Sequence, residues 1–149
     1  SRQQSHTAAV LIDIDHFEAV NSNFGHDAGD QIILQVGEVI QQKCRTSDVL
    51  ARTGGGEFLL VLPETDLDGA RILAERIRED VSAGPMVANQ QRIPVTVSLG
   101  VAGAVGEIKL DTLSGEAGRA MNLAKMGGRN RVASVENKPV YLSSRERRG

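Results

Sequence analysis

The sequence predicts one α/β domain in which a mainly antiparallel sheet is flanked by helices. Short apolar runs of strand character alternate with longer stretches whose apolar residues recur at helical spacing. A glycine-rich turn, Gly54-Gly55-Gly56, separates two strand-like segments and predicts a hairpin. The chain has 149 residues, enough for one hydrophobic core but not for two. We therefore expect a single domain over residues 1–149, with its core at about residues 7–136.

The N-terminal part is expected to contain one buried strand and two helices. The apolar run Ala8–Ile12 is short and ends in an aspartate pair, which is typical of a buried strand. A short helix is expected over Phe17–Phe24, with Asp15 as its candidate N-cap. A second helix begins at Asp27 or Gly29, because apolar residues then recur at helical spacing.

The remaining chain shows the alternation of strands and helices that a layered domain requires. Apolar periodicity, together with Gly and Pro as breakers, sets the expected boundaries. In order, we expect strands Asp48–Arg52 and Phe58–Leu62, a helix Asp66–Val81, a loop Gly84–Gln91, a strand Ile93–Val101, a helix Leu110–Met126, a strand Arg131–Val135 and a loose tail Ser143–Gly149.

This order, β-α-α-β-β-α-β-α-β, matches a ferredoxin-like, palm-type arrangement built on a split βαβ unit. In that arrangement the third strand lies between the first and second and is antiparallel to both. The hairpin tip then lies beside the carboxyl end of the first strand. Asp13 and the turn Gly54–Glu57 are therefore predicted neighbours, although they are far apart in the sequence.

Composition excludes several classes of protein. Hydrophobic residues make up 40% and charged residues 24%, which is ordinary for a globular domain. A net charge of −2 argues against a nucleic-acid partner, which normally requires a basic face. The lone Cys44 rules out an internal disulfide framework and fits a reducing compartment. No apolar run is long enough to span a bilayer and no signal peptide opens the chain, so we expect a cytoplasmic domain, whose parent protein can still carry a membrane anchor.

Five sequence blocks occur in an order and at spacings that resemble those of GGDEF domains, the diguanylate cyclases. The resemblance covers about Ala8–Val135. It implies a reaction that joins two GTP molecules into cyclic di-GMP and releases two pyrophosphates, with one GTP on each of two facing domains. The blocks are Asp13–Phe17, Asn21, Gly25–Asp30, Arg52–Phe58, and Ala124-Lys125 with Gly128–Val132.

The resemblance implies a metal and phosphate site near the turn. The Asp13 carboxylate and the Ile14 carbonyl would bind Mg²⁺ or Mn²⁺, because such ions prefer oxygen ligands; a strand-end aspartate can also simply cap a helix. Backbone N–H groups of His16 and Phe17, at a helix start, would meet the phosphates.

Other phosphate and base contacts follow from the same resemblance. Lys125 and Arg129, expected on one helical face, would bind the terminal phosphates; alternatively they form a solvated basic face. Asn21 and Asp30 would read guanine, since an amide and a carboxylate match its edge; capping and turn formation are the alternative roles.

A second site is implied before the hairpin. Arg45-Thr46-Ser47-Asp48 resembles the family's Arg-x-x-Asp inhibitory site for cyclic di-GMP, and Arg76 matches a second arginine of that site. Guanidinium groups pair well with phosphates and stack on guanine. The alternative is a surface ion pair of little energetic value.

The turn itself departs from the family at the position where the chemistry needs an acid. Gly56 stands where family members carry Asp or Glu, and Glu57, the next residue, is expected to point to the opposite face. The family's opening segment is also missing, and four further positions differ. We therefore favour a catalytically impaired regulatory module that binds GTP and cyclic di-GMP, with an active cyclase as the alternative. A homodimer and additional sensor or output domains are the expected partners. The four further positions are Glu18, Ser22, Gly118 and Asn122.

Overall fold

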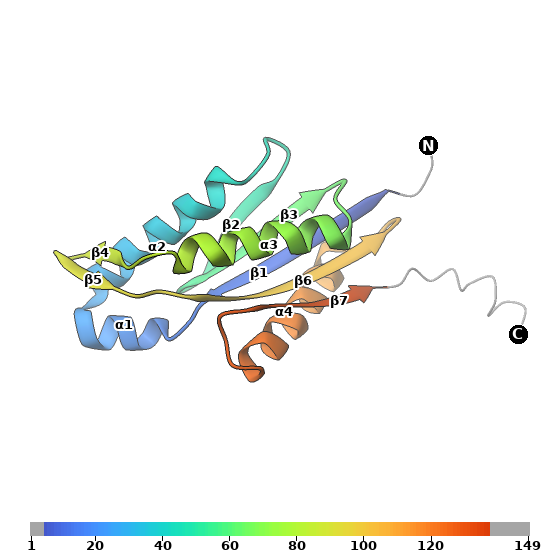
Figure 1. Cartoon of the computed structure of the whole chain (residues 1–149). Helices are drawn as coiled ribbons and strands as arrows, with labels where there is room; N and C mark the ends of the chain where they lie inside the picture. Colours follow the sequence, from blue (N-terminus) through green and yellow to red (C-terminus); the bar gives the residue numbers. More distant parts are fainter. Residues whose placement is uncertain (1–4, 138–149) are drawn as a thin grey trace, which may run out of the picture.

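The computed structural model describes residues 5–137 and contains one five-stranded sheet (Figure 1). Its strands, in spatial order, are β2 (Val49–Gly54), β3 (Glu57–Pro63), β1 (His6–Ile14), β6 (Val97–Val105) and β7 (Val132–Asn137). All neighbours are antiparallel except β6 and β7, which run parallel. The predicted position of β3 between β1 and β2 is confirmed.

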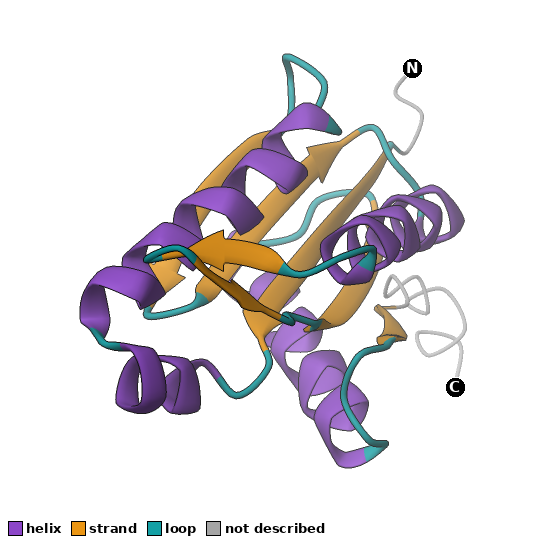
Figure 2. Cartoon of the chain, turned by 60° about the vertical axis from the view of Figure 1, so that its left-hand side comes forward, coloured by secondary structure: helices purple, strands orange, loops and turns teal. Residues whose placement is uncertain are grey.

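Helices cover both faces of this sheet. On one face lie α2 (His26–Gln42) and α3 (Leu67–Ser82), and on the other lies α4 (Leu110–Met126), packed against β1, β6 and β7 (Figures 1 and 2). The short helix α1 (Phe17–Phe24) follows the carboxyl end of β1. The predicted bounds of α1 and α4 are both confirmed.

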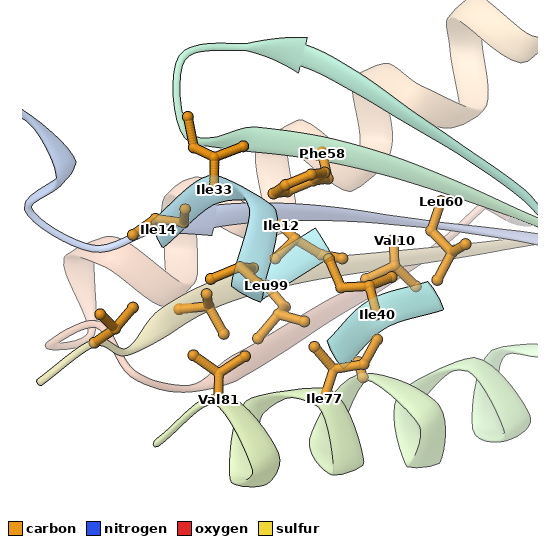
Figure 3. Close-up of a cluster of buried hydrophobic side chains, with 14 of the residues drawn as sticks. Val10, Ile12, Ile14, Ile33, Ile40, Phe58, Leu60, Ile77, Val81 and Leu99 are labelled. Carbon is orange, nitrogen blue, oxygen red and sulfur yellow. The ribbon is translucent and has the colours of Figure 1, made fainter. Parts of the chain in front are cut away.

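The main core lies between the sheet and the pair α2–α3. Strand alternation places every second residue of β3 in this layer: Phe58, Leu60 and Leu62 are buried, whereas the residues between them are half-buried on the α4 side. Figure 3 shows Ile40 of α2 and Ile77 of α3 beside the buried strand residues. Asp66 caps α3 by accepting a hydrogen bond from the Gly69 amide at 2.8 Å.

Two expectations about the segment after α3 were wrong. The expected loop Gly84–Gln91 contains a small hairpin, β4 (Met86–Ala88) and β5 (Gln91–Ile93). The expected strand Ile93–Val101 is interrupted, because Pro94 cannot donate to a strand ladder and β6 starts only at Val97.

The hairpin β4–β5 is fastened to α2 by two glutamines. Gln35 donates to the Val87 carbonyl and accepts from its amide, at 2.8 and 3.3 Å. Gln31 does the same with the side chain and amide of Asn89, at 2.9 and 3.1 Å. The tail Ser143–Gly149 lies outside the described residues. Among the helices of residues 5–137, none has the length and apolar character needed to cross a bilayer.

Candidate functional site

The end of β1 and the glycine-rich turn lie side by side, as the strand order predicts. Asp13 is paired with Glu57 across the β1–β3 ladder. The Ile14 amide donates to the Gly56 carbonyl at 2.8 Å, which fixes the turn against the strand end. The first and fourth sequence blocks, Asp13–Phe17 and Arg52–Phe58, therefore lie together at this end of the sheet.

Glu57 lies on the same face of the sheet as Asp13. Residues directly opposite each other in an antiparallel pair share a face, and these two are such a pair. The expectation that Glu57 points away from a side chain at position 56 stays a prediction, because Gly56 has no side chain and belongs to the turn, and the strand begins only at Glu57. The Glu57 carboxylate also accepts from the Thr53 hydroxyl at 3.3 Å.

Gly56 has a backbone conformation and a setting that suit glycine. Its φ is +77°, a left-handed value that side chains rarely adopt. The ring of Phe17 lies directly over it, so that an added Cβ would be 2.9 Å from the Phe17 Cγ atom. Phe17 thus closes the turn from the side of α1.

Lys125, in the last turn of α4, reaches Asp13. Its Nζ atom lies 2.8 Å from Oδ2 of Asp13, and both side chains are partly exposed. Arg129 is not on the same helical face, contrary to expectation, because α4 ends at Met126 and Arg129 has a left-handed φ of +65° in the following loop. Both cations still belong to one end of α4.

The proposed guanine readers lie where α1 meets α2. The side-chain oxygen of Asn21 is buried without a hydrogen-bond partner within the described part of the chain. It rests on Gly29, where an added Cβ would be only 1.9 Å from that oxygen. Asp30, the next residue of α2, is exposed. An unpaired buried acceptor is costly, so it marks a place where a donor from a ligand would be favourable.

The start of α1 differs from expectation. His16, with φ +58°, is the N-cap residue and makes no side-chain capping bond. Asp15 does not cap the helix; its carboxylate is buried and accepts from Thr96 and Ser98 instead. The first amides of α1 remain without intrahelical partners, as at any helix start.

Arg45 and Asp48 form a closed local unit at the far end of β2. Both the backbone amide and the guanidinium of Arg45 bond the Asp48 carboxylate, at 2.7 and 3.0 Å. Nη2 of Arg45 also donates to the Pro63 carbonyl at 2.8 Å and to the Thr65 hydroxyl at 2.7 Å. The hydrogen bond and charge of Asp48 raise the pKa of Arg45. The Asp48 side chain is only 2% exposed, so its carboxylate is occupied by Arg45. Sequence reasoning missed Thr65, which no motif marks.

Arg76 lies on the same side of the domain as this unit. It is exposed on α3, one turn before Asp80, which forms an ion pair with Lys43 at the end of α2. Arg45 follows Lys43 by two residues but bonds Pro63 and Thr65, which precede α3, whereas Arg76 lies within α3. A site shared by the two arginines therefore stays a prediction.

The two carboxylates near the turn are candidate ligands for a divalent cation. Asp13 and Glu57 supply carboxylates on one face, and Mg²⁺ usually combines one or two carboxylates with substrate phosphates. Gly56 supplies no ligand. Within residues 5–137, no group of three or more His, Cys, Asp and Glu side chains is arranged to hold a metal ion.

Comparison with known proteins decides the family. Residues 1–131 match the family described as "Diguanylate cyclase, GGDEF domain". The chain belongs to the GGDEF family. Its members use a divalent metal for catalysis.

Three similar proteins illustrate the relationship. An uncharacterized Bacillus subtilis protein, YhcK, is 41% identical over 133 residues, which is 88% of this chain and 37% of YhcK. The diguanylate cyclase DgcP of Pseudomonas aeruginosa is 34% identical over 83% of this chain and 18% of its own length. The GGDEF domain of DgcB from Caulobacter crescentus, solved in complex with cyclic di-GMP, is 31% identical with a TM-score of 0.82 over 87% of this chain and 78% of that chain. This GGDEF domain thus spans well under half of those two full-length relatives.

Proposed function

We propose that this GGDEF domain binds GTP and cyclic di-GMP as a regulatory module and makes cyclic di-GMP very slowly or not at all. The observation that carries the proposal is Gly56, which offers no carboxylate and lies in a turn closed by Phe17. In the cyclase step a 3′-hydroxyl attacks an α-phosphate and pyrophosphate leaves. Divalent metal held by carboxylates of the turn and the strand end would stabilise the charge that develops on the phosphate oxygens. Gly56 provides no carboxylate for this purpose.

The binding residues support retention of GTP. Lys125 already provides a cation beside Asp13 at 2.8 Å, where a triphosphate would need positive charge. The Asp30 carboxylate would accept from the N1 and N2 hydrogens of guanine, and the Asn21 amide would donate to and accept from the remaining base edge. A bound Mg²⁺ or Mn²⁺ would be held by Asp13 and the Ile14 carbonyl together with phosphate oxygens, and it would neutralise phosphate charge.

An active cyclase is the second candidate, and one observation favours it. Glu57 lies opposite Asp13 on the same face and is a carboxylate within the site. If it can replace the missing acid, two domains facing each other as a homodimer would turn over GTP.

Calorimetry with GTP and ATP tests the binding proposal. We expect GTP to bind at least tenfold more tightly, because a site that hydrogen-bonds one base edge leaves its polar groups unpaired with the other. Asn21→Ala and Asp30→Ala should each reduce the preference. Equal affinity of the wild-type protein for both nucleotides would remove the guanine assignment.

Gly29→Ala is expected to abolish most of this preference without unfolding the protein. The new methyl group would meet the Asn21 oxygen at 1.9 Å and push that flexible side chain away. Alanine otherwise favours a helix by about 0.5–1 kcal/mol over glycine. We expect the melting temperature to stay unchanged or to rise. The ratio of the affinity for GTP to the affinity for ATP should fall about tenfold, which is the scale of one hydrogen bond to a charged or desolvated group.

Gly115→Ala provides the matched control, since Gly115 also lies in a helix and an added Cβ there meets nothing within 4 Å. It should leave the ratio unchanged. A normal GTP preference in Gly29→Ala would show that Asn21 does not read the base.

A further inference from the structure

The carboxylate of Asp15 is a buried charge that joins three separate segments. Asp15 is 6% exposed. Its oxygens accept from the Thr96 hydroxyl at 2.7 Å, the Ser98 hydroxyl at 2.6 Å and the Asn130 backbone amide at 3.1 Å. None of the ion pairs within residues 5–137 includes Asp15, so these neutral donors satisfy it. Leaving a buried carboxylate without hydrogen-bond donors costs free energy. The Asp15 carboxylate therefore restrains the positions of its three donor groups.

The donor Asn130 lies in a loop with two left-handed residues. Arg129 and Asn130 have φ values of +65° and +48°, which is uncommon for arginine and more readily adopted by asparagine. The Arg129 amide is tied back to the Ala124 carbonyl at 3.0 Å. From the other side, Arg78 of α3 donates to the Asn130 side-chain oxygen at 3.0 Å and is itself held by Glu75. Asn130 is thus held through its main chain by Asp15 and through its side chain by Arg78.

The end of β1 is linked twice to the end of α4. Asp13 contacts Lys125 at 2.8 Å, and Asp15, two residues later, contacts Asn130 at 3.1 Å. Lys125 and Arg129 are the two cations expected at the phosphates. Lys125 itself contacts β1 through Asp13, and Arg129 precedes Asn130, which Asp15 holds. The two links set where α4 and its loop present positive charge relative to the turn.

We propose that Asp15 is a positioning residue for polyphosphate recognition, which acts by holding the Arg129–Asn130 loop in its left-handed conformation. This inference rests on the proposed binding of GTP. If Asp15 had a purely structural role, its substitution would lower the affinity for every ligand, because the folded domain would be less stable. A positioning Asp15 affects ligands that carry a triphosphate and leaves recognition of the base unchanged.

The test compares Asp15→Asn with Asp66→Asn. Asp66 also accepts from a backbone amide, that of Gly69 at 2.8 Å, but caps α3 away from the loop. Affinities are measured for GTP, inorganic triphosphate and guanosine. We expect Asp15→Asn to lower the affinities for GTP and triphosphate about tenfold, which is the scale of a hydrogen bond to a charged group, and to leave the affinity for guanosine unchanged. Asp66→Asn should change none of the three. Equal weakening of GTP and guanosine, or no weakening, would overturn the inference.

Amide hydrogen exchange of the ligand-free proteins gives an independent readout. Exchange at Arg129 and Asn130 should become at least about tenfold faster in Asp15→Asn and stay unchanged in Asp66→Asn. Should Asp15→Asn not fold, Thr96→Val removes one donor from the same carboxylate oxygen and is expected to show a smaller change in the same direction. Failure of the wild-type protein to bind GTP would reject the proposed function, while unchanged exchange at Asn130 would reject the role of Asp15.

Discussion

Gly56→Asp is expected to raise cyclic di-GMP synthesis by roughly a hundredfold or more. The substitution adds a carboxylate next to the Asp13–Glu57 pair, where a second metal needs it. Each factor of ten corresponds to about 1.4 kcal/mol of transition-state stabilisation, so a hundredfold is modest for one metal ligand. Product formed from GTP with Mg²⁺ or Mn²⁺, separated by chromatography, measures the change.

The same substitution is expected to lower the stability of the domain. The φ of +77° disfavours any side chain, and the new Cβ would be 2.9 Å from Phe17 Cγ, so either the turn or the ring must move. We expect a cost of about 1–2 kcal/mol, seen as a lower melting temperature.

Gly56→Ala separates these two effects. It should show the same loss of stability and no gain in synthesis. Wild-type turnover at ordinary rates of about one per second or faster would mean that Glu57 suffices and the domain is an active cyclase. No gain in Gly56→Asp would place the defect elsewhere, at Gly118 or Asn122.

The shape of the site could be predicted because strand order determines it. Once the first strand and the hairpin were recognised, the split βαβ order placed Asp13 beside the turn, and the register confirms that placement. That Glu57 shares a face with Asp13 could not be predicted, because it depends on the exact register between β1 and β3, which the order of the strands does not determine.

Two other misses have the same physical origin, namely contacts between distant segments. Asp15 precedes a helix and local sequence favours a cap, but its partners Thr96, Ser98 and Asn130 come from the other end of the chain. Arg129 fits a helical spacing from Lys125, yet the Gly127-Gly128 pair ends the helix first. Local propensity identifies the candidate residues, and tertiary partners decide what they do.

Arg45→Ala is expected to weaken binding of cyclic di-GMP at least tenfold. We expect the wild-type domain to bind it with micromolar affinity, about −8 kcal/mol, through Arg45 and Arg76. The site lies at the opposite end of β2 from Gly56, since Val49 pairs with Val61 and Gly54 with Glu57. Binding there therefore needs neither a metal nor an acid in the turn, and titration calorimetry measures it directly.

The ligand-free structure explains how Arg45 can be ready for a phosphate. Its recorded hydrogen bonds to residues 5–137 use Nε and Nη2, so that the bonds to Asp48, Pro63 and Thr65 hold the guanidinium plane in place. A guanidinium has five N–H donors, and those on Nη1 are left to meet a phosphate with little further ordering cost. Asp48, at 2% side-chain exposure, would read a guanine edge only after releasing part of Arg45.

Arg119→Ala is the matched control for this experiment. Arg119 also pairs with an acid three residues away, Glu116 at 3.2 Å, but on α4 at the other face of the sheet. The Arg119→Ala variant should bind cyclic di-GMP as the wild-type domain does.

Arg45→Lys keeps the positive charge but lacks the planar guanidinium group. It should lose part of the affinity for cyclic di-GMP, which separates the effect of charge from that of geometry. If the wild-type domain does not bind cyclic di-GMP, or if Arg45→Ala binds it as tightly as Arg119→Ala, the surroundings of Arg45 are not the receptor site. The Arg45–Asp48 pair then serves only to close the turn before β2.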